Sequence, residues 1–119
     1  RFVAVYVKKA QADFKGFLRG GRAVNFEAKH TDTPRMEQDR VTPEQAERLE
    51  RAFTYGAAAF VVCSFSGRDF FRVPWEVWRS MRALYGHKYM TVQEAEPFRV
   101  PIGGPGVLLF LEGLEERKC

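Results

Sequence analysis

The 119-residue sequence has little cysteine and no long apolar run, and each shortage excludes a class of protein. Cys63 and Cys119 are too few and too far apart to build a disulfide framework or a zinc site. Cys63 lies in the apolar run 57–65, where a free buried thiol is expected. No segment approaches the ~18 apolar residues of a membrane span, and residues 2–7 are too short for a secretory signal. We therefore expect a soluble, cytoplasmic protein.

Repeats and low-complexity tracts are absent too, and the composition fits one domain over residues 1–119, with 45% apolar residues and eleven Phe.

The net charge is only +4, but residues 1–30 carry seven Lys and Arg against Asp13 and Glu27, which gives +5 there and −1 elsewhere. Basic charge around two carboxylates suits a polyanion such as DNA. A solvated basic edge explains the charge alone equally well.

The two acidic residues fall on a predicted hairpin, residues 12–18 and 22–30, preceded by a strand over residues 2–9. A two-residue turn at Gly20-Gly21 would mix apolar and charged side chains on both faces. A three-residue turn over 19–21 instead pairs Phe14 with Phe26 and Asp13 with Glu27, so the apolar pattern favours this register. Opposed Cβ atoms lie ~4.5 to 5.5 Å apart. Two carboxylates that close repel unless a cation lies between them.

This arrangement suits phosphodiester hydrolysis. Glu27 and Lys29 are two residues apart on one strand and therefore share a face. Mg²⁺ usually takes one or two carboxylates and keeps several waters, so Asp13 and Glu27 fit it, with the Ala28 carbonyl as a third protein oxygen. Lys29 would stabilise charge at phosphorus or orient the attacking water. The alternative is a surface hairpin whose Glu–Lys pair contributes under ~1 kcal/mol.

The next segment, residues 31–41, has no periodicity and is predicted to be a loop that contacts DNA. Thr42, Pro43 and Gln45 then form a capping-box start for a helix that ends near Tyr55, before Gly56. Gln45 either caps this helix or reaches the active site, and the sequence leaves both interpretations open.

The remaining pattern predicts a strand over 57–66 covered on both faces, a hairpin partner over 70–73 and a helix over 74–84 that stops at Gly86. Trp75 and Trp78 are interpreted as core rather than as base-stacking platforms. A turn over 103–106 and a final helix over 107–116 complete the prediction. His30 and His87 are more plausible as surface histidines than as ligands.

Four segments in this order, 12–16, 20–31, 41–45 and 59–62, resemble the RecU-type Holliday junction resolvases. More broadly, the chain resembles the PD-(D/E)xK nuclease superfamily, phage-borne members included, over about residues 3–80. The resemblance implies an α/β, restriction-endonuclease-like fold with a mixed β-sheet flanked by α-helices. It also implies a homodimer that cuts four-way DNA junctions with Mg²⁺ or Mn²⁺.

Carried over to matching positions, the resemblance makes Asp13 and Glu27 metal ligands, Lys29 the catalytic lysine and Gln45 a supporting catalytic residue. The residues expected at the DNA are Lys8, Lys15, Arg19, Arg22 and Thr31. We expect the family's N-terminal helix to be missing from this chain, and Glu44 stands where the family usually has His. The alternatives are a related nuclease acting on flaps, ends or restriction sites, and a non-catalytic DNA-binding module.

Overall fold

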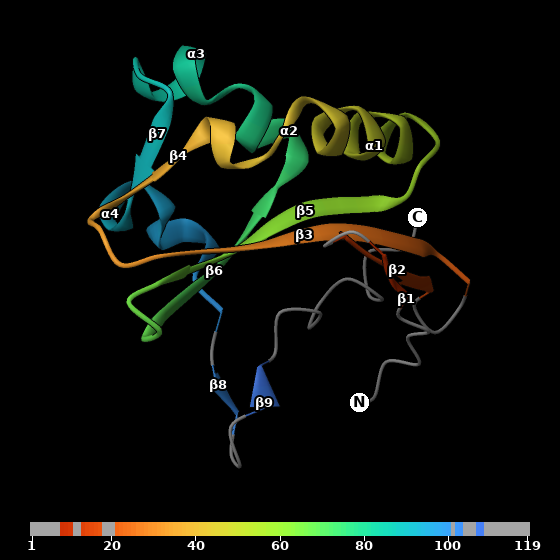
Figure 1. The fold of residues 1–119 in the computed structure, drawn as a ribbon, viewed down its shortest axis with the longest axis horizontal. Helices are drawn as coiled ribbons and strands as arrows, with labels where there is room; N and C mark the ends of the chain where they lie inside the picture. Colours follow the sequence, from red (N-terminus) through yellow and green to blue (C-terminus); the bar gives the residue numbers. More distant parts are fainter. Residues whose placement is uncertain (1–7, 11–12, 18–20, 101, 104–106, 109–119) are drawn as a thin grey trace.

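A mixed β-sheet organises the chain, as the ribbon in Figure 1 shows. The computed structural model describes residues 8–10, 13–17, 21–100, 102–103 and 107–108, with side chains over 21–100. Within these residues the main sheet has five strands in the order β1-β2-β3-β5-β6. Their bounds are β1 Lys8–Ala10, β2 Asp13–Phe17, β3 Ala23–Thr31, β5 Ala58–Phe65 and β6 Asp69–Pro74. Only β3 and β5 pair in parallel. This α/β arrangement is compatible with the restriction-endonuclease-like fold predicted above.

The helices lie mainly on one side of the main sheet, where α1 and α2 contact β5 (Figure 1). A smaller sheet pairs β4 with β7, and β8 pairs with β9. None of the helices in the described residues is long and apolar enough to cross a membrane. The bounds of the remaining elements are β4 Arg35–Glu37, η1 Gln38–Arg40, α1 Pro43–Thr54, α2 Trp75–Arg79, α3 Met81–Tyr85, β7 Tyr89–Thr91, α4 Val92–Ala95, η2 Glu96–Phe98, β8 Ile102–Gly103 and β9 Val107–Leu108.

The β2–β3 register confirms the prediction made from the apolar pattern. Phe14 pairs with Phe26, and Asp13 pairs with Glu27. Residues 18–20, which include two of the three residues of the predicted turn over 19–21, lie outside the described residues, as does most of the strand predicted over 2–9. The backbone therefore has the register that opposes the two acidic positions.

Helix α1 begins and ends where its sequence signals predicted. The Thr42 hydroxyl accepts a hydrogen bond from the Gln45 backbone N–H, and the Gln45 side chain accepts one from the Thr42 N–H, which completes the capping box. Gly56, just past the helix, has φ +90°, a left-handed conformation that glycine adopts without strain. The helix leads directly into β5 and is held against it.

Three predictions for the loops and helices were wrong. Residues 31–41 contain β4 and η1, because Met36 is fully buried and pairs with Met90 of β7. The helix over 74–84 is divided at Ser80 into α2 and α3. Where it is described, the segment predicted as a final helix forms β9, and residues 109–116 lie outside the described part.

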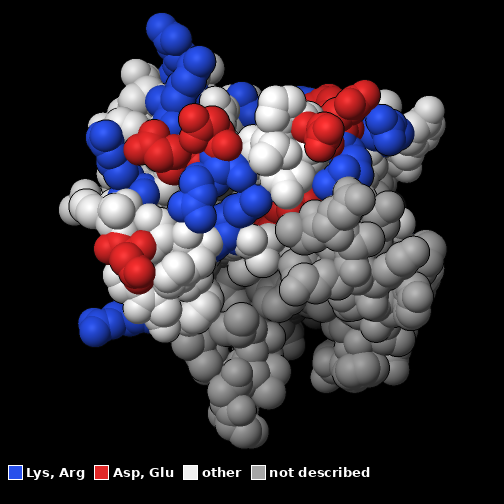
Figure 2. All heavy atoms as spheres, in the orientation of Figure 1, with Lys and Arg blue, Asp and Glu red and all other residues white. Residues whose placement is uncertain are grey.

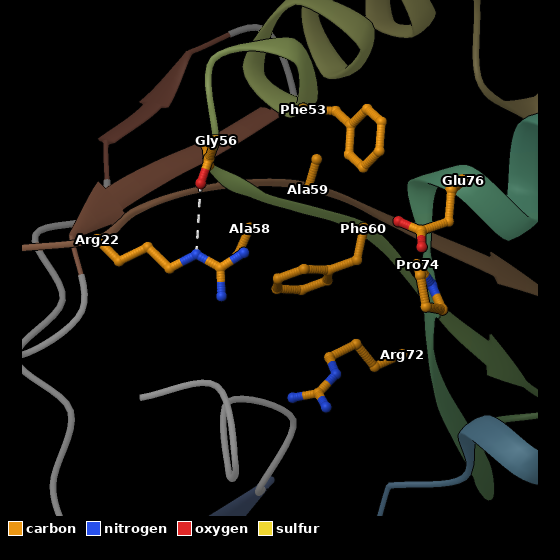
Figure 3. Close-up of a pocket in the computed structure, with 10 residues that line it drawn as sticks. Arg22, Phe53, Gly56, Ala58, Ala59, Phe60, Arg72, Pro74 and Glu76 are labelled. Carbon is orange, nitrogen blue, oxygen red and sulfur yellow. Dashed lines mark hydrogen bonds between the residues drawn. The ribbon is translucent and has the colours of Figure 1, made fainter. Parts of the chain in front are cut away.

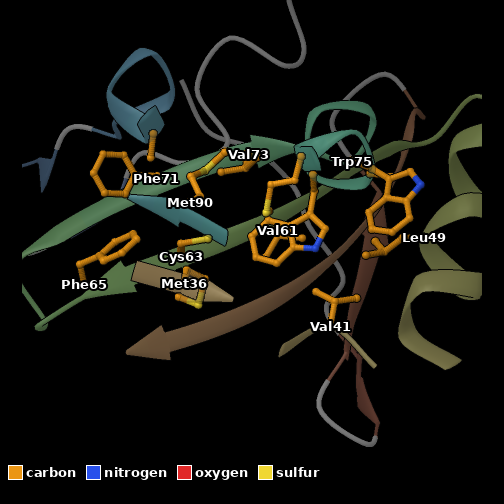
Figure 4. Close-up of a cluster of buried hydrophobic side chains, with 14 residues drawn as sticks. Met36, Val41, Leu49, Val61, Cys63, Phe65, Phe71, Val73, Trp75 and Met90 are labelled. Atoms are coloured by element: carbon orange, nitrogen blue, oxygen red, sulfur yellow. The ribbon is translucent and has the colours of Figure 1, made fainter. Parts of the chain in front are cut away.

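The core lies between the sheet and the helices, with the side chains shown in Figure 4. Alternate β5 residues Val61 and Cys63 meet Leu49 of α1 and the two tryptophans of α2. Trp75 and Trp78 are buried, which confirms that they are core residues. Cys63 is a free buried thiol, as predicted, and burial raises its pKa to about 12. The sheet face that carries Cys63 is also the face of the candidate site.

Candidate active site

Strand β3 sends three polar residues to the helix-covered face of the sheet. Glu27, Lys29 and Thr31 pair in parallel with Val61, Cys63 and Phe65 of β5, respectively. Those β5 residues belong to the core beneath α1 and α2. Since directly paired residues share a face, β3 carries its acidic, basic and hydroxyl groups along the edge of an apolar core.

Glu27 is fully buried, at 0% exposure. Arg48 of α1 approaches it, with Nη2 3.8 Å from Oε2 and a quarter of the arginine side chain exposed. An ionised carboxylate is costly to bury unless positive charge or hydrogen bonds compensate for it. A buried acid at this position on a strand is therefore unusual for a purely structural residue.

Lys29 is partly buried beside Glu27 on the same strand. Burial lowers the pKa of its ammonium below the ordinary value, the charge of Glu27 opposes that shift, and the charge of Arg40 adds to it. Arg40 is held nearby, because its Nη2 donates a hydrogen bond of 2.7 Å to the His30 carbonyl. The amine thus lies where an additional anion, such as a phosphate oxygen, would stabilise its charged form.

The backbone places Asp13 opposite Glu27, one strand further out in the sheet. The structure describes only the backbone at this position. Ala28 follows Glu27 and is exposed. The register therefore meets the backbone requirement for two neighbouring carboxylates, and the convergence of their oxygens remains a prediction.

Gln45 and Thr31 both make hydrogen bonds within their own turns. The Gln45 side chain is buried, and its Oε1 accepts from the Thr42 backbone N–H at 3.0 Å. The Thr31 hydroxyl, also buried, accepts from the Thr33 N–H at 3.1 Å and lies 2.9 Å from the Thr33 hydroxyl. Gln45 therefore does cap α1, and its amide nitrogen is the group that an active-site role would use.

The predicted DNA-contacting residues are spread over the N-terminal strands. Lys8 pairs with Lys15, which pairs with Asn25, so these positions form one row of the sheet. Arg19 lies outside the described residues. Arg22 is exposed, and its Nε donates a 3.4 Å hydrogen bond to the Gly56 carbonyl.

Arg22 also lines a cavity of about 260 Å³ at the start of β5. In Figure 3 the side chains of Arg22 and Arg72 lie around the ring of Phe60, with the Arg22 hydrogen bond to Gly56 drawn as a dashed line. Phe60 stacks in turn on Phe26, with ring centroids 5.0 Å apart. Positive charge thus flanks an aromatic surface next to the hairpin.

Two charged residues of the site were missed by the sequence reasoning, namely Arg40 and Arg48. Arg48 follows Gln45 by three residues, and residues three apart on a helix share a face. That spacing was the available signal for Arg48. Arg40 belongs to η1, within the segment wrongly predicted to be a loop.

The histidines have local partners on the surface. His30 is about half exposed and lies 3.1 Å from Asp32 Oδ1 and 3.2 Å from Ser64 Oγ. His87 is partly buried, lies 2.9 Å from Glu94 Oε2 and stacks on Tyr89. Among the described residues no three His, Cys, Asp or Glu side chains group as a metal site.

Charges of both signs cover the upper half of the face shown in Figure 2, where Lys and Arg side chains gather near the centre and acidic side chains lie beside them. On the part of that face that the structure describes, basic and acidic side chains are intermixed, which is compatible with binding a polyanion at a few fixed points.

Comparison with known proteins identifies the family. The model of the family Recombination protein U matches residues 2–116, which is nearly the whole chain, whereas no curated protein matches. That family consists of Holliday junction resolvases, which belong to a class of divalent-metal-dependent nucleases. The chain therefore belongs to the RecU family, and its β2–β3 register and its capped helix α1 agree with the resemblance described above.

Proposed function

We propose that this protein is a metal-dependent DNA endonuclease that resolves four-way junctions in recombination and repair, and that Mg²⁺ is its cofactor. The observation that carries the proposal is the fully buried Glu27 carboxylate, two residues from Lys29 on β3 and opposite Asp13 in the register. A pair of opposed acidic positions beside a lysine is costly for a fold and useful for phosphodiester chemistry.

The donor set fits a hard divalent cation. Asp13 and Glu27 would supply carboxylate oxygens, and the Ala28 carbonyl would supply a backbone oxygen. Mg²⁺ prefers oxygen ligands and needs few from the protein, and Mn²⁺ accepts the same donors. When bound, the cation would neutralise charge on the attacked phosphate and lower the pKa of a water molecule.

Lys29 has the position to act on the reacting phosphate. Its burial and the nearby Arg40 charge lower its pKa in the protein alone, so an arriving phosphate oxygen would favour the protonated amine. The protonated amine would donate a hydrogen bond to the oxygen on which negative charge develops. The Gln45 amide nitrogen and the Thr31 hydroxyl would support this site from α1 and from the end of β3.

DNA binding is assigned to the basic N-terminal strands. Lys8, Lys15, Arg19 and Arg22 would contact phosphates, with Thr31 at the end of the same face. Each such contact releases counterions and makes the affinity depend on salt. Resolution of a junction requires cuts in two strands, and a homodimer would supply one active site for each cut.

The test is cleavage of a synthetic four-way junction, with each strand labelled in turn, in Mg²⁺, in Mn²⁺ and in EDTA. We expect paired cuts with either metal and none in EDTA. A flap and a linear duplex of the same sequence serve as comparison substrates. Faster cutting of the flap or the duplex would assign the protein to a different substrate class within the superfamily, and cutting in EDTA would exclude the metal mechanism.

Variants test the residue assignments. Asp13→Asn and Glu27→Gln should remove cutting while junction binding stays measurable, and Lys29→Ala should lose turnover with Mn²⁺ binding retained. Two matched controls lie on exposed positions, Glu47→Gln on α1 and Lys88→Ala before β7. Full cleavage by either acidic variant in Mg²⁺ would refute the ligand assignment.

A further inference from the structure

Arg48 is the cation that α1 brings to the buried acid of the site. Its Nη2 lies 3.8 Å from Oε2 of Glu27, which is beyond ordinary hydrogen-bond length and within ion-pair range. Glu27 is fully buried, whereas a quarter of the Arg48 side chain is exposed. The acid is thus fixed in the sheet, and the arginine reaches it from the rim of the helix.

The surroundings of Glu27 are rich in positive charge. Lys29 follows Glu27 by two residues on the same face of β3, and Arg40 donates a 2.7 Å hydrogen bond to the carbonyl of His30, the residue after Lys29. A divalent cation that enters this region must overcome repulsion from the positive groups. Arg48 lies within ion-pair range of the carboxylate that the cation would use.

We propose that Arg48 is a positioning residue that holds Glu27 as its counter-ion in the metal-free protein and gives up this contact when a divalent cation binds. The inference rests on the proposed function, because it takes Glu27 as a metal ligand. Arg48 would keep the carboxylate oriented before the metal arrives. The same charge would weaken metal binding to the protein alone, so tight binding would require the extra negative charge of DNA.

The first measurement is urea unfolding of the full chain in EDTA for the wild type, Arg48→Gln, Glu27→Gln and the double variant. We expect Arg48→Gln to be less stable than the wild type, because it leaves a buried carboxylate without its guanidinium. The double variant should lose less than the sum of the two single losses, which is the signature of a direct favourable coupling.

The second measurement is calorimetric titration of the same proteins with Mn²⁺. Arg48→Gln should bind Mn²⁺ more tightly, on the order of tenfold, because one repelling charge next to the cation is gone. A residue with a purely structural role would show unchanged or weaker binding. Arg48→Lys keeps the positive charge, so its affinity for Mn²⁺ should be nearer that of the wild type. This variant provides the test if Arg48→Gln does not fold.

The control is Arg51→Gln on the same helix. Arg51 is exposed and pairs with Glu47 at 3.4 Å. Its replacement should therefore change neither the coupling free energy between Arg48 and Glu27 nor the affinity for Mn²⁺. If Arg48→Gln binds Mn²⁺ as well as the wild type or more weakly, and Glu27→Gln does not bind it, then Arg48 does not give way to the cation. The proposed function would be unaffected by that result. If the wild type and Glu27→Gln bind Mn²⁺ equally well, Glu27 is not a metal ligand, and the proposed role of Arg48 fails with that assignment.

Discussion

Helix α1 takes part in two carboxylate–arginine pairs of opposite character. On its sheet side, Arg48 lies 3.8 Å from the fully buried Glu27. On its α2 side, Glu50 accepts hydrogen bonds of 2.7 Å from the Trp75 indole and of 2.7 and 2.8 Å from Arg79, with about half of the glutamate side chain exposed. The exposed acid is held tightly, and the buried acid has the longer ion pair.

This contrast separates a structural acid from a candidate functional one. Short hydrogen bonds to Trp75 and then to Arg79 lower the pKa of Glu50, so its negative charge stabilises the joint between α1 and α2. The Glu27 pair lacks that short geometry and lies beside a lysine and opposite a second acidic position. Under the proposal above, a divalent cation would take the place of Arg48 beside this carboxylate.

The largest expected difference between the two acids is in cleavage. Glu27→Gln should slow junction cutting by more than the ~10- to 100-fold that losing a supporting residue costs, because it removes a ligand. Glu50→Gln, the same chemical change on the other side of α1, should leave the rate near the wild type. Gel assays at saturating Mg²⁺ compare the two, and equal losses would break the distinction between the acids.

Gln45 offers a smaller effect that separates capping from catalysis. Thr42→Ala removes one half of the capping box and should cost about 1 kcal/mol of stability. Gln45→Ala removes the other half and should cost a similar amount, but it should also slow cutting about tenfold, because its amide nitrogen supports the site. If both variants lose stability alike and neither slows cutting, Gln45 is only a cap.

Much of the hairpin could be predicted from sequence because its signals are local. The alternation of Phe14 and Phe26 with charged residues selected one register, because a slip by one residue would have mixed apolar and charged residues on both faces. The capping box of Thr42 and Gln45 likewise fixed the start of α1. Local pattern thus predicted the backbone that positions Glu27 and Lys29.

What the sequence did not reveal depends on contacts between distant segments. Met36 forms a strand only because Met90 pairs with it, more than fifty residues away, so the segment around it was predicted to be a loop. Arg40 and Arg48 were missed for the same reason, since their roles arise from packing against β3. The predicted register was therefore confirmed, whereas the predicted site left out two nearby arginines.

Stability against acid should reveal the Glu50 pair. The folded pKa of Glu50 is lower than its ordinary value of 4.5, so its charge contributes stability above that pH, which is lost as the pH falls through the folded pKa. Glu50→Gln should therefore be less stable than the wild type at neutral pH, and the difference should shrink below pH 4.5. Urea midpoints from neutral to acidic pH measure this, with Glu47→Gln as the control. A difference that is constant with pH would contradict the charge-based role.

The smallest expected effect has the opposite sign and concerns Lys29. Its folded pKa is lower than the ordinary 10.5, so the charged amine costs stability at neutral pH, and that cost fades as the pH rises toward 10.5. Lys29→Met should stabilise the metal-free protein by less than about 1 kcal/mol, since partial exposure screens the charge. Urea unfolding in EDTA at neutral and alkaline pH measures the gain, with the exposed Lys88→Met as the control.

If the charge at Lys29 on β3 costs stability while the charge at Glu50 on α1 contributes it, the two charges serve different purposes, the first retained for chemistry and the second for folding. A Lys29→Met protein that loses stability at neutral pH would show that the amine belongs to the structural set. Glu27 would then be the one residue of this pair on β3 whose charge costs stability for the sake of function.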